Sequence, residues 1–566
     1  PENAISISFD LTRRALSGTS RISLPPGTPL NLAGGTLAIS SAVLERSGQT
    51  PLALRPAADN AIVLPAADTA QVVYVSWTLT VPENGEADNL IEKNGITLAG
   101  LWHPLPDIDM VYRLEALLPE NFTGISEAES MTQPPDGKGR NLFTSSFSHP
   151  VGSIHFIAGP YSVKQRTLAN GVILAGLFFQ EDSTLADEYL EQASAYMKRY
   201  EELIGPYPYP RYSIVENRLP TGYGMPTFTL LGQAVVRLPF IKETSLGHEI
   251  LHSWFGNSVH VDDAGGNWCE GLTTYLADHL YAEDRGEGGQ FRKEQLQRYA
   301  SYVPQDNDLA LAAFTNASDR QPLARHIRAV GYDKGSLVFH MLRRSLGDDL
   351  FFQGLRRFSQ TMRFKQAGWD DLEENFAAVA GKGLRSFFDQ WLTRTDTIRF
   401  SIDRVDVSQV EGRSVITFTL HQKSAKPYEF DLPVLVSTRT GDSRHTVRID
   451  EQDKEVKISV DDLPTAMALD PDYDLMRDLG PGEDAPTWSR FLGAGSKTVV
   501  LPTEDKATTY APLLDMLQGM GCETVSLDKL ENKAMEMGSF IFLGSSKQSR
   551  GLFADPGHAP GGFTLD

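Results

Sequence analysis

HEILH, at residues 248–252, is the stretch that decides how this chain is organised. It reads H-E-x-x-H within a segment from about Ser245 to Phe255 that we expect to be helical. Residues four positions apart share one face of a helix, so His248 and His252 can point at one metal ion. Glu249 lies one step round the helix and can reach a water at that ion. The pattern is typical of a zinc hydrolase, and the alternative is an exposed helix that holds two histidines by chance.

A catalytic zinc needs a third protein ligand and one open position. The segment NWCEGLTTY at 267–275 begins a second helical pattern, and Glu270 in it lies eighteen positions after His252. An aspartate at 262–263, in a glycine-containing loop, could bind instead, or Glu270 could be a solvated carboxylate in a first helical turn. A helix is the more rigid support. We therefore predict one zinc per chain, bound by Glu270 and the two histidines.

Several further segments occur in a fixed order around this pattern. They are LWHPLPD at 101–107, GPYPYP at 205–210, HEILHSWFGN at 248–257, WCEGLTTY at 268–275, GYDKG at 331–335 and FFDQWL at 387–392. Together they resemble the gluzincin aminopeptidases, the family of aminopeptidase N and leukotriene hydrolase, over roughly residues 1–475. The resemblance implies that Glu249 is the general base and that Tyr332 stabilises the oxyanion. It also implies a substrate-binding segment at Tyr223, Gly224, Met225 and Pro226.

That substrate-binding segment departs from the family pattern. The family has G-x-M-E-N, whose glutamate binds the free α-amine of the substrate, and this chain has YGMPT at 223–227, with Pro226 in place of the glutamate. The residues at 97–100, TLAG, offer no second polar group for the amine. Unless another acid such as Glu216 or Asp109 reaches the site, we expect poor discrimination in favour of a free N-terminus. The hydrolytic residues are retained while the amine anchor is missing, so the exopeptidase assignment competes with an endopeptidase or a hydrolase of N-blocked substrates.

Length and composition limit the other possibilities. The chain has 566 residues and a formal charge of −21, which indicates several domains and does not favour nucleic acid or an anionic membrane as a partner. No apolar run approaches the ~20 residues that span a bilayer. Pro1 leads directly into a strand pattern, so we expect a soluble protein from which an upstream segment, with a signal peptide as one candidate, has been removed. Periplasmic or extracellular export is thus one option, and the oligomeric state is open.

Hydrophobic periodicity changes along the chain and predicts an α+β multidomain fold. We expect an N-terminal β-sheet domain at 1–163, a thermolysin-like α/β catalytic domain at 164–396, a β sandwich at 397–478 and a partial α/β domain at 484–566. Within the catalytic domain, Gln233–Val236 is expected to be the edge strand beside the substrate.

Two functions from different classes follow. The first is zinc-dependent hydrolysis of a peptide substrate. The second is a catalytically idle module that binds a partner through its C-terminal α/β region. A scaffold would not need Glu249 or Tyr332, so their retention favours the enzyme.

Overall fold

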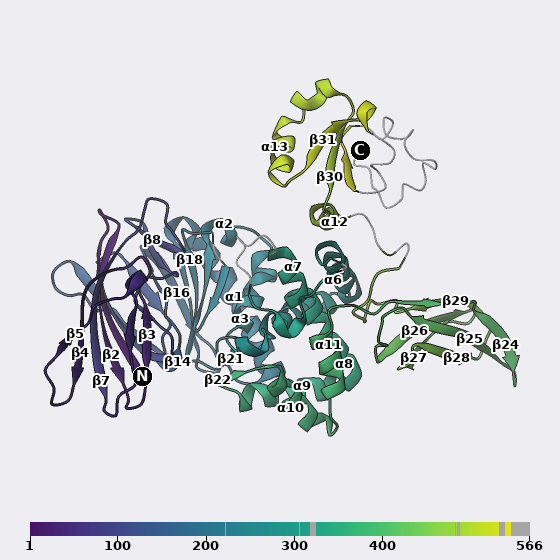
Figure 1. Cartoon of the computed structure of the whole chain (residues 1–566), viewed down its shortest axis with the longest axis horizontal. Coiled ribbons are helices and arrows are strands. Elements are labelled where there is room, and N and C mark those ends of the chain that lie inside the picture. The colour runs from purple at the N-terminus through teal and green to yellow at the C-terminus, as the bar shows by residue number, and fades with distance from the viewer. Residues whose placement is uncertain are drawn as a thin grey trace. The chain divides into compact units, whose positions relative to one another are not determined.

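The computed structural model describes residues 1–220, 222–304, 306–316, 324–480, 483, 487–530 and 538–544. It is a multidomain arrangement of mixed sheets and helices (Figure 1). Contacts divide the chain into two units. Unit 1 comprises Pro1–His260 with Ser359–Gln366, and unit 2 comprises Val261–Phe358 with Ala367–Asp566. The four expected domains therefore stay a proposal, and residues 545–566 of the last one lie outside the described residues.

Unit 1 begins with an eight-stranded sheet in the order β13-β14-β11-β1-β2-β7-β4-β5. Its strands are β1 Glu2–Asp10, β2 Ala15–Leu24, β4 Ala38–Arg46, β5 Leu52–Ala53, β7 Gln71–Thr80, β11 Met110–Pro119, β13 Ser130–Thr132 and β14 Arg140–Val151. Alternate residues of β2 and β7 are buried, which is the period-two pattern that the sequence predicted. Two smaller sheets complete this part. They contain β3 Leu30–Ala33, β6 Ile62–Leu64 and β10 Leu105–Pro106, and β8 Asn89–Glu92, β9 Gly95–Leu98, β12 Thr123–Ser126 and β15 Phe156–Gly159.

A five-stranded sheet in unit 1 has the order β16-β17-β18-β20-β19. Its strands are β16 Tyr161–Thr167, β17 Ile173–Phe179, β18 Arg211–Asn217, β19 Gly222–Met225 and β20 Phe228–Gly232. The expected boundary at residue 163 falls inside β16, which pairs with β17. Helix α1, Ala186–Ile204, buries one face, which includes Tyr189 and Tyr200. It is followed along the chain by α2 Gln233–Val236, the short η3 Ile241–Glu243 and α3 Ser245–Leu251.

The expected edge strand at Gln233–Val236 is wrong. These residues form the helical turn α2, and the edge of the sheet is β19, antiparallel to β20. The β-branched pair Val235 and Val236 favours a strand locally, but β20 already ends at Gly232 and only Val236 of the turn is buried. The edge strand is therefore the segment that carries Gly224.

Unit 2 is helical between Cys269 and Thr393. Its helices are α4 Cys269–Thr274, α5 Leu280–Asp284, α6 Gly288–Tyr302, α7 Ala324–Arg328, α8 Gly335–Leu346, α9 Asp348–Thr361 (which continues into unit 1), α10 Trp369–Ala380 and α11 Arg385–Thr393. Two π-helical segments interrupt the α-helical runs, η5 Tyr275–His279 after α4 and η7 Ala329–Lys334 before α8. π-Helical segments are rare in proteins, and those that occur often lie at functional sites.

Two antiparallel sheets follow in unit 2. The first contains β23 Phe400–Ile402, β24 Asp406–Val410, β25 Arg413–Gln422 and β28 Asp453–Val460, and the second β26 Phe430–Thr438, β27 Asp442–Ile449 and β29 Pro464–Leu469. Alternate residues of β25 and β26 are buried, as a sandwich requires.

The C-terminal region adds α12 Trp488–Gly493 and a sheet in the order β31-β30-β32. The strands are β30 Lys497–Leu501, β31 Glu523–Ser526 and β32 Ser539–Phe542, with helix α13 Ala511–Gly519 between the first two. All pairings are parallel, in agreement with the predicted α/β arrangement.

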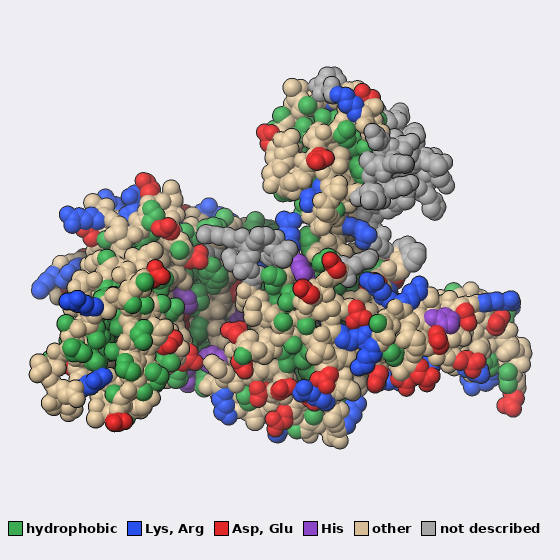
Figure 2. All heavy atoms as spheres, in the orientation of Figure 1, with side chains coloured by type: hydrophobic (Ala, Val, Ile, Leu, Met, Phe, Trp, Pro, Cys, Tyr) green, Lys and Arg blue, Asp and Glu red, His purple; other side chains and the backbone are tan. Residues whose placement is uncertain are grey.

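The charged side chains are interspersed on the face shown in Figure 2, where acidic and basic groups alternate over short distances. Among the described residues, no helix is both long enough and apolar enough to cross a bilayer.

Helix α4 and the η7–α8 helix touch at their backbones in unit 2. A Cβ added at Gly271 would lie 2.8 Å from the Cα of Gly335 and 2.9 Å from the carbonyl oxygen of Gly331. Real side chains do not tolerate such distances, so this crossing requires glycine. It places Glu270, on α4, next to the segment that carries Tyr332.

We expect Gly271→Ala to lower the stability of unit 2, by about 1–3 kcal/mol for an overpacked contact. Gly383→Ala is the matched control, because nothing lies within 4 Å of a Cβ at that exposed position. The measurement is the midpoint of thermal unfolding of both variants. Equal midpoints for the two variants would contradict the backbone contact.

Candidate active site

The H-E-x-x-H motif lies on α3 and on the turn that follows it. The helix ends at Leu251, earlier than the expected Phe255, and His252 is its C-terminal cap. Nδ1 of His252 lies 3.1 Å from the carbonyl oxygen of Phe255. Because a carbonyl only accepts, Nδ1 carries the proton and Nε2 is left with its lone pair for a metal. The earlier end of the helix thus positions the carbonyl that orients this imidazole.

Aromatic side chains elsewhere in unit 1 hold α3 and its turn in place. The Tyr200 hydroxyl on α1 donates to the carbonyl of Gly247 at 3.0 Å. The Trp254 indole donates to the carbonyl of Gly205 at 2.9 Å, and the Tyr209 hydroxyl donates to the carbonyl of Asn257 at 2.7 Å. The GPYPYP segment at 205–210 therefore supports the turn beyond the H-E-x-x-H motif, which explains why the two segments occur together.

Glu270 lies in the first turn of α4, a helix whose six residues are all buried. Two asparagines form a series of hydrogen bonds between its carboxylate and the backbone N–H of Cys269. Nδ2 of Asn316 donates to Oε1 of Glu270 at 3.3 Å, and Nδ2 of Asn267 donates to Oδ1 of Asn316 at 3.0 Å. Oδ1 of Asn267 in turn accepts from the backbone N–H of Cys269 at 2.8 Å. The sequence alone does not indicate Asn316 as part of the site, because 46 residues separate it from Glu270 and no spacing rule links them.

The three predicted ligands come together. His248, His252 and Glu270 each offer one ligand atom, and these atoms lie within 4.8 Å of one another. Two imidazoles and a carboxylate are a donor set that suits zinc, and three protein ligands leave a position for water or substrate. Metal ligands are usually oriented by a hydrogen bond from a neighbouring group. His252 has such a bond through its Nδ1, and Glu270 has one through its carboxylate.

Tyr332 lies on the π-helical segment η7, beside Glu270 in unit 2. Burial raises the pKa of its hydroxyl, and the negative charge of Glu270 raises it further. Tyr332 therefore keeps its proton at neutral pH and can donate a hydrogen bond. The Arg328 guanidinium lies 4.7 Å from the centre of its ring.

The edge strand β19 lies against α3 at Gly224. A Cβ added at Gly224 would lie 2.9 Å from Oε2 of Glu249 and 3.1 Å from Cβ of His252. Nδ2 of Asn257 donates to the carbonyl oxygen of Gly224 at 3.0 Å. Tyr223, next to it, is 37% exposed, whereas Met225 is buried. Gly224 is thus the point at which the sheet edge and the proposed general base make contact.

Pro226 lies in the turn after β19, not in the strand. The turn consists of Pro226 and Thr227, and Thr227 has a φ of 70°, a left-handed value that is strained for a β-branched residue. The Thr227 hydroxyl accepts a hydrogen bond from the backbone N–H of Ala128 at 3.2 Å. Neighbouring Glu127 is fully buried, and its carboxylate accepts from the backbone N–H of His155 at 2.7 Å and lies 2.5 Å from Nδ1 of the same residue.

The two acids named as possible replacements for the missing glutamate, Glu216 and Asp109, have other partners. Glu216 is fully buried on β18, where its carboxylate accepts from the backbone N–H of Phe179 at 2.8 Å, and burial raises its pKa to about 7. Asp109 acts electrostatically on Tyr112 and His260. Neither has a described hydrogen bond to residues 223–227. The sequence did not indicate a third acid, Glu127. Its neighbour Ala128 donates a backbone hydrogen bond to the Thr227 hydroxyl of this turn.

The chain is similar in sequence to known peptidases over part of its length. Residues 242–391 match the model of the peptidase family M1 domain. Aminopeptidase 2, mitochondrial, of Saccharomyces cerevisiae is 25% identical over 44% of this chain and 28% of its own length. Aminopeptidase N of Lactococcus lactis is 30% identical over 33% and 22%. Human endoplasmic reticulum aminopeptidase 1 is 22% identical over 48% and 31%.

Each match thus spans less than a third of the relative's own length. The matched residues 242–391 include all three metal-ligand candidates, Glu249 and Tyr332. Residues 242–391 thus match a peptidase family M1 domain, and the chain is similar over part of its length to aminopeptidases.

Proposed function

We propose that this protein is a zinc-dependent metallopeptidase with a thermolysin-like catalytic domain that hydrolyses peptide bonds. The observation that carries the proposal is the convergence of ligand atoms from His248, His252 and Glu270. These three residues would hold one zinc ion. When bound, zinc supplies Lewis-acid polarisation of the substrate carbonyl and a lowered pKa for the attacking water.

The chain itself supplies the proton transfers and part of the oxyanion stabilisation. Glu249 takes the proton from the attacking water and later delivers it to the leaving amine. The Tyr332 hydroxyl keeps its proton and donates to the developing oxyanion. Its nearness to Glu270 in unit 2 supports this role.

The substrate would lie along β19 as an added strand, held by backbone groups around Gly224 and Met225. Tyr223 would border the substrate. β19 is the edge of its sheet, so its outer backbone groups face no further strand among the described residues. The contact between Gly224 and Glu249 would then hold the scissile bond close to the general base.

A second candidate is an endopeptidase or a hydrolase of N-blocked substrates. The observation that favours it is the Pro226–Thr227 turn, which has neither a carboxylate nor, at Pro226, a backbone N–H. A third, an idle binding module, would not need the water-activating Glu249.

The metal assignment and the general base are tested by two variants. We expect Glu249→Gln to retain stoichiometric zinc and to lose turnover by roughly 10²–10⁴-fold, because the amide cannot accept the proton of water. His252→Ala should lose the zinc itself. The measurements are zinc content by elemental analysis and peptide hydrolysis with and without a chelator. Full zinc and full activity in His252→Ala would refute the site, and a zinc-loaded wild type without hydrolysis would favour the idle module.

Tyr332→Phe tests the oxyanion role. The phenyl ring keeps the packing of η7 and removes only the donor, so kcat should fall while KM changes little, since the oxyanion exists only in the transition state. Steady-state kinetics on one peptide series decides this. An effect confined to KM would mark Tyr332 as a residue that binds the ground state.

The amine anchor is tested with matched free and N-acetylated peptides. Burying an ammonium without a carboxylate costs several kcal/mol, so we expect weak activity on single-residue amides and comparatively good cleavage of longer or N-blocked peptides. The measurement is the ratio of kcat/KM for each pair of peptides. Pro226→Glu, which restores the family's acid, should shift this ratio toward the free amine.

The opposite result would identify a replacement acid. A preference of about a hundredfold or more for the free amine in the wild type corresponds to roughly 2.7 kcal/mol. It would show that another carboxylate binds the ammonium. Glu127→Gln would then test whether that carboxylate is the one beside the Thr227 turn.

A further inference from the structure

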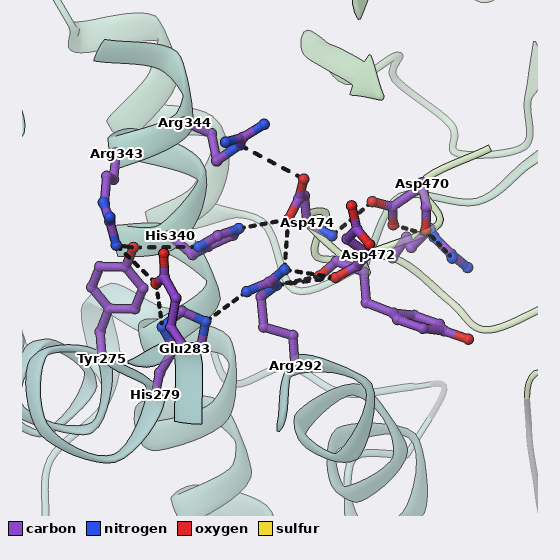
Figure 3. A network of polar contacts seen from close by, with 12 residues as sticks. Tyr275, His279, Glu283, Arg292, His340, Arg343, Arg344, Asp470, Asp472 and Asp474 are labelled. Carbon is purple, nitrogen blue, oxygen red and sulfur yellow. Dashed lines mark hydrogen bonds and ion pairs between the residues drawn. The ribbon is translucent and has the colours of Figure 1, made fainter. Parts of the chain in front are cut away.

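A buried polar network in unit 2 connects the catalytic helices to the segment that follows the last strand of the sandwich (Figure 3). Its centre is Asp474, five residues beyond β29. The residues that carry the argument are Tyr275, His279, Arg292, His340, Arg343 and Asp474.

Asp474 is the anion that this network surrounds. Its Oδ1 accepts from Nη2 of Arg292 at 2.8 Å and from Nε2 of His340 at 2.9 Å. The side chains of Asp474, Arg292 and His340 are 8%, 7% and 6% exposed. These donors hold the pKa of Asp474 down to about 2 in spite of its burial, so the carboxylate is charged at any working pH. A buried charge of this kind depends on all its partners.

The first branch runs from Asp474 through His340 to Tyr275. Since Nε2 of His340 donates to the carboxylate, a neutral imidazole has Nδ1 free to accept, and Nδ1 lies 3.3 Å from the Tyr275 hydroxyl. The Tyr275 oxygen accepts from Nη1 of Arg343 at 3.2 Å. Along this branch, which runs from Arg343 through Tyr275 and His340 to Asp474, each donor therefore has one acceptor.

The second branch runs from Asp474 through Arg292 to His279. Arginine only donates, so the 2.6 Å contact from Nη1 of Arg292 makes Nε2 of His279 an acceptor and leaves the proton on Nδ1. That nitrogen lies 3.7 Å from the carboxylate of Glu283. Burial lowers the pKa of both histidines, which keeps them neutral and in these tautomers.

Both branches end on the helices that carry the proposed catalytic residues. Tyr275 and His279 begin and end η5, which continues α4, the helix of Glu270. His340 lies on α8, which continues η7, the segment of Tyr332. Asp474 thus bonds to α8 through His340 and to α6 through Arg292, and it reaches the α4–η5 run only through the contacts of these two residues with Tyr275 and His279. The α4 run and the η7–α8 run meet at Gly271 and Gly335.

We propose that Asp474 is a positioning residue for hydrolysis. It binds His340 on the run that carries Tyr332, and His340 and Arg292 in turn contact Tyr275 and His279 on the run that carries Glu270, so that Asp474 fixes the two runs relative to each other. The segment beyond the β sandwich is then part of the catalytic apparatus, although it contributes no group to the reaction. This inference rests on the proposed peptidase function, which assigns the roles of Glu270 and Tyr332.

The test compares Asp474→Asn with Asp472→Asn. The two substitutions make the same chemical change two positions apart. The Asp472 side chain is half-exposed and pairs with Arg444, while only its backbone carbonyl accepts from Arg292. Asp474→Asn removes the charge that Arg292 and His340 share at Oδ1 and places an amide N–H₂ at the position of Oδ2, which lies 3.7 Å from Nε of Arg344. Asp472→Asn leaves the network as it is.

We expect Asp474→Asn to lower kcat by about 10- to 100-fold with KM little changed. Zinc binding should weaken by a similar factor, which is the usual effect of substituting a residue that supports a metal site without binding the metal. Zinc affinity is measured by chelator competition, and the geometry of the ligands by the visible spectrum of the cobalt-substituted protein. Asp472→Asn should match the wild type in all three measurements.

Tyr275→Phe is the second variant in case Asp474→Asn does not fold. It removes one hydroxyl at the far end of the first branch and should lower kcat in the same direction by a smaller factor. Combined with Asp474→Asn, its effect should be less than additive, because both act through His340.

The outcomes separate the two proposals. Wild-type protein that binds no zinc and cleaves no peptide overturns the proposed function itself. An active, zinc-loaded wild type together with an Asp474→Asn variant that matches Asp472→Asn in kcat, zinc affinity and cobalt spectrum overturns the positioning role alone. A folded Asp474→Asn variant that is merely less heat-stable, with unchanged kcat, also overturns it, and a normal kcat in Tyr275→Phe does so if Asp474→Asn fails to fold.

Discussion

The helix that carries Glu270 and the helix that carries Tyr332 touch at their backbones, where Gly271 meets Gly335. A side chain at either glycine would separate the two helices, and the carboxylate and the phenol would no longer lie side by side. Gly224 plays the corresponding part in unit 1, where the sheet edge lies against Glu249. Close backbone contact, which only glycine permits, is thus the constraint under which both halves of the candidate site are built.

The close crossing of the two helices fixes the distance between them but not the orientation of their side chains. Buried polar groups fix that orientation. Asn267 and Asn316 lead to the carboxylate of Glu270, and the carbonyl of Phe255 orients His252. Asp474 and the two neutral histidines add a second layer around α4 and α8. In a low-dielectric interior each of these groups must find its partner, so each restricts the rotation of the next one.

The Pro226–Thr227 turn is where the chain departs from its relatives in chemistry while the backbone remains a hairpin. Proline removes both the carboxylate and an N–H at the place where the family binds an ammonium. The strained left-handed Thr227 is stabilised through Ala128, beside a buried carboxylate, Glu127, that is already paired with His155. Backbone strain of this kind is maintained where the surrounding structure determines it, and it commonly lies at functional sites. The chain therefore has the H-E-x-x-H residues together with a proline, and not a carboxylate, at position 226.

The sequence by itself determined the local features whose cause is short-range. The four-residue spacing of His248 and His252 follows from helix geometry, and strands such as β7 and β25 follow from period-two burial. It failed at Gln233–Val236, where β-branched residues favour a strand and the tertiary structure, in which β20 has already ended and β19 forms the edge, makes a helical turn. The end of α3 at Leu251 was also missed, because the carbonyl that binds His252 acts through the turn that follows.

Only the tertiary structure decided which distant residues meet. Asn316 lies 46 residues from Glu270, Ala128 lies 99 from Thr227, and Asp474 lies 134 from His340. No periodicity connects such pairs, since their contact depends on how helices cross and where loops return. The residues that perform chemistry have type and spacing that can be read along the chain, whereas the residues that hold them are selected by position in space, and a buried hydrogen bond leaves no local pattern in the sequence.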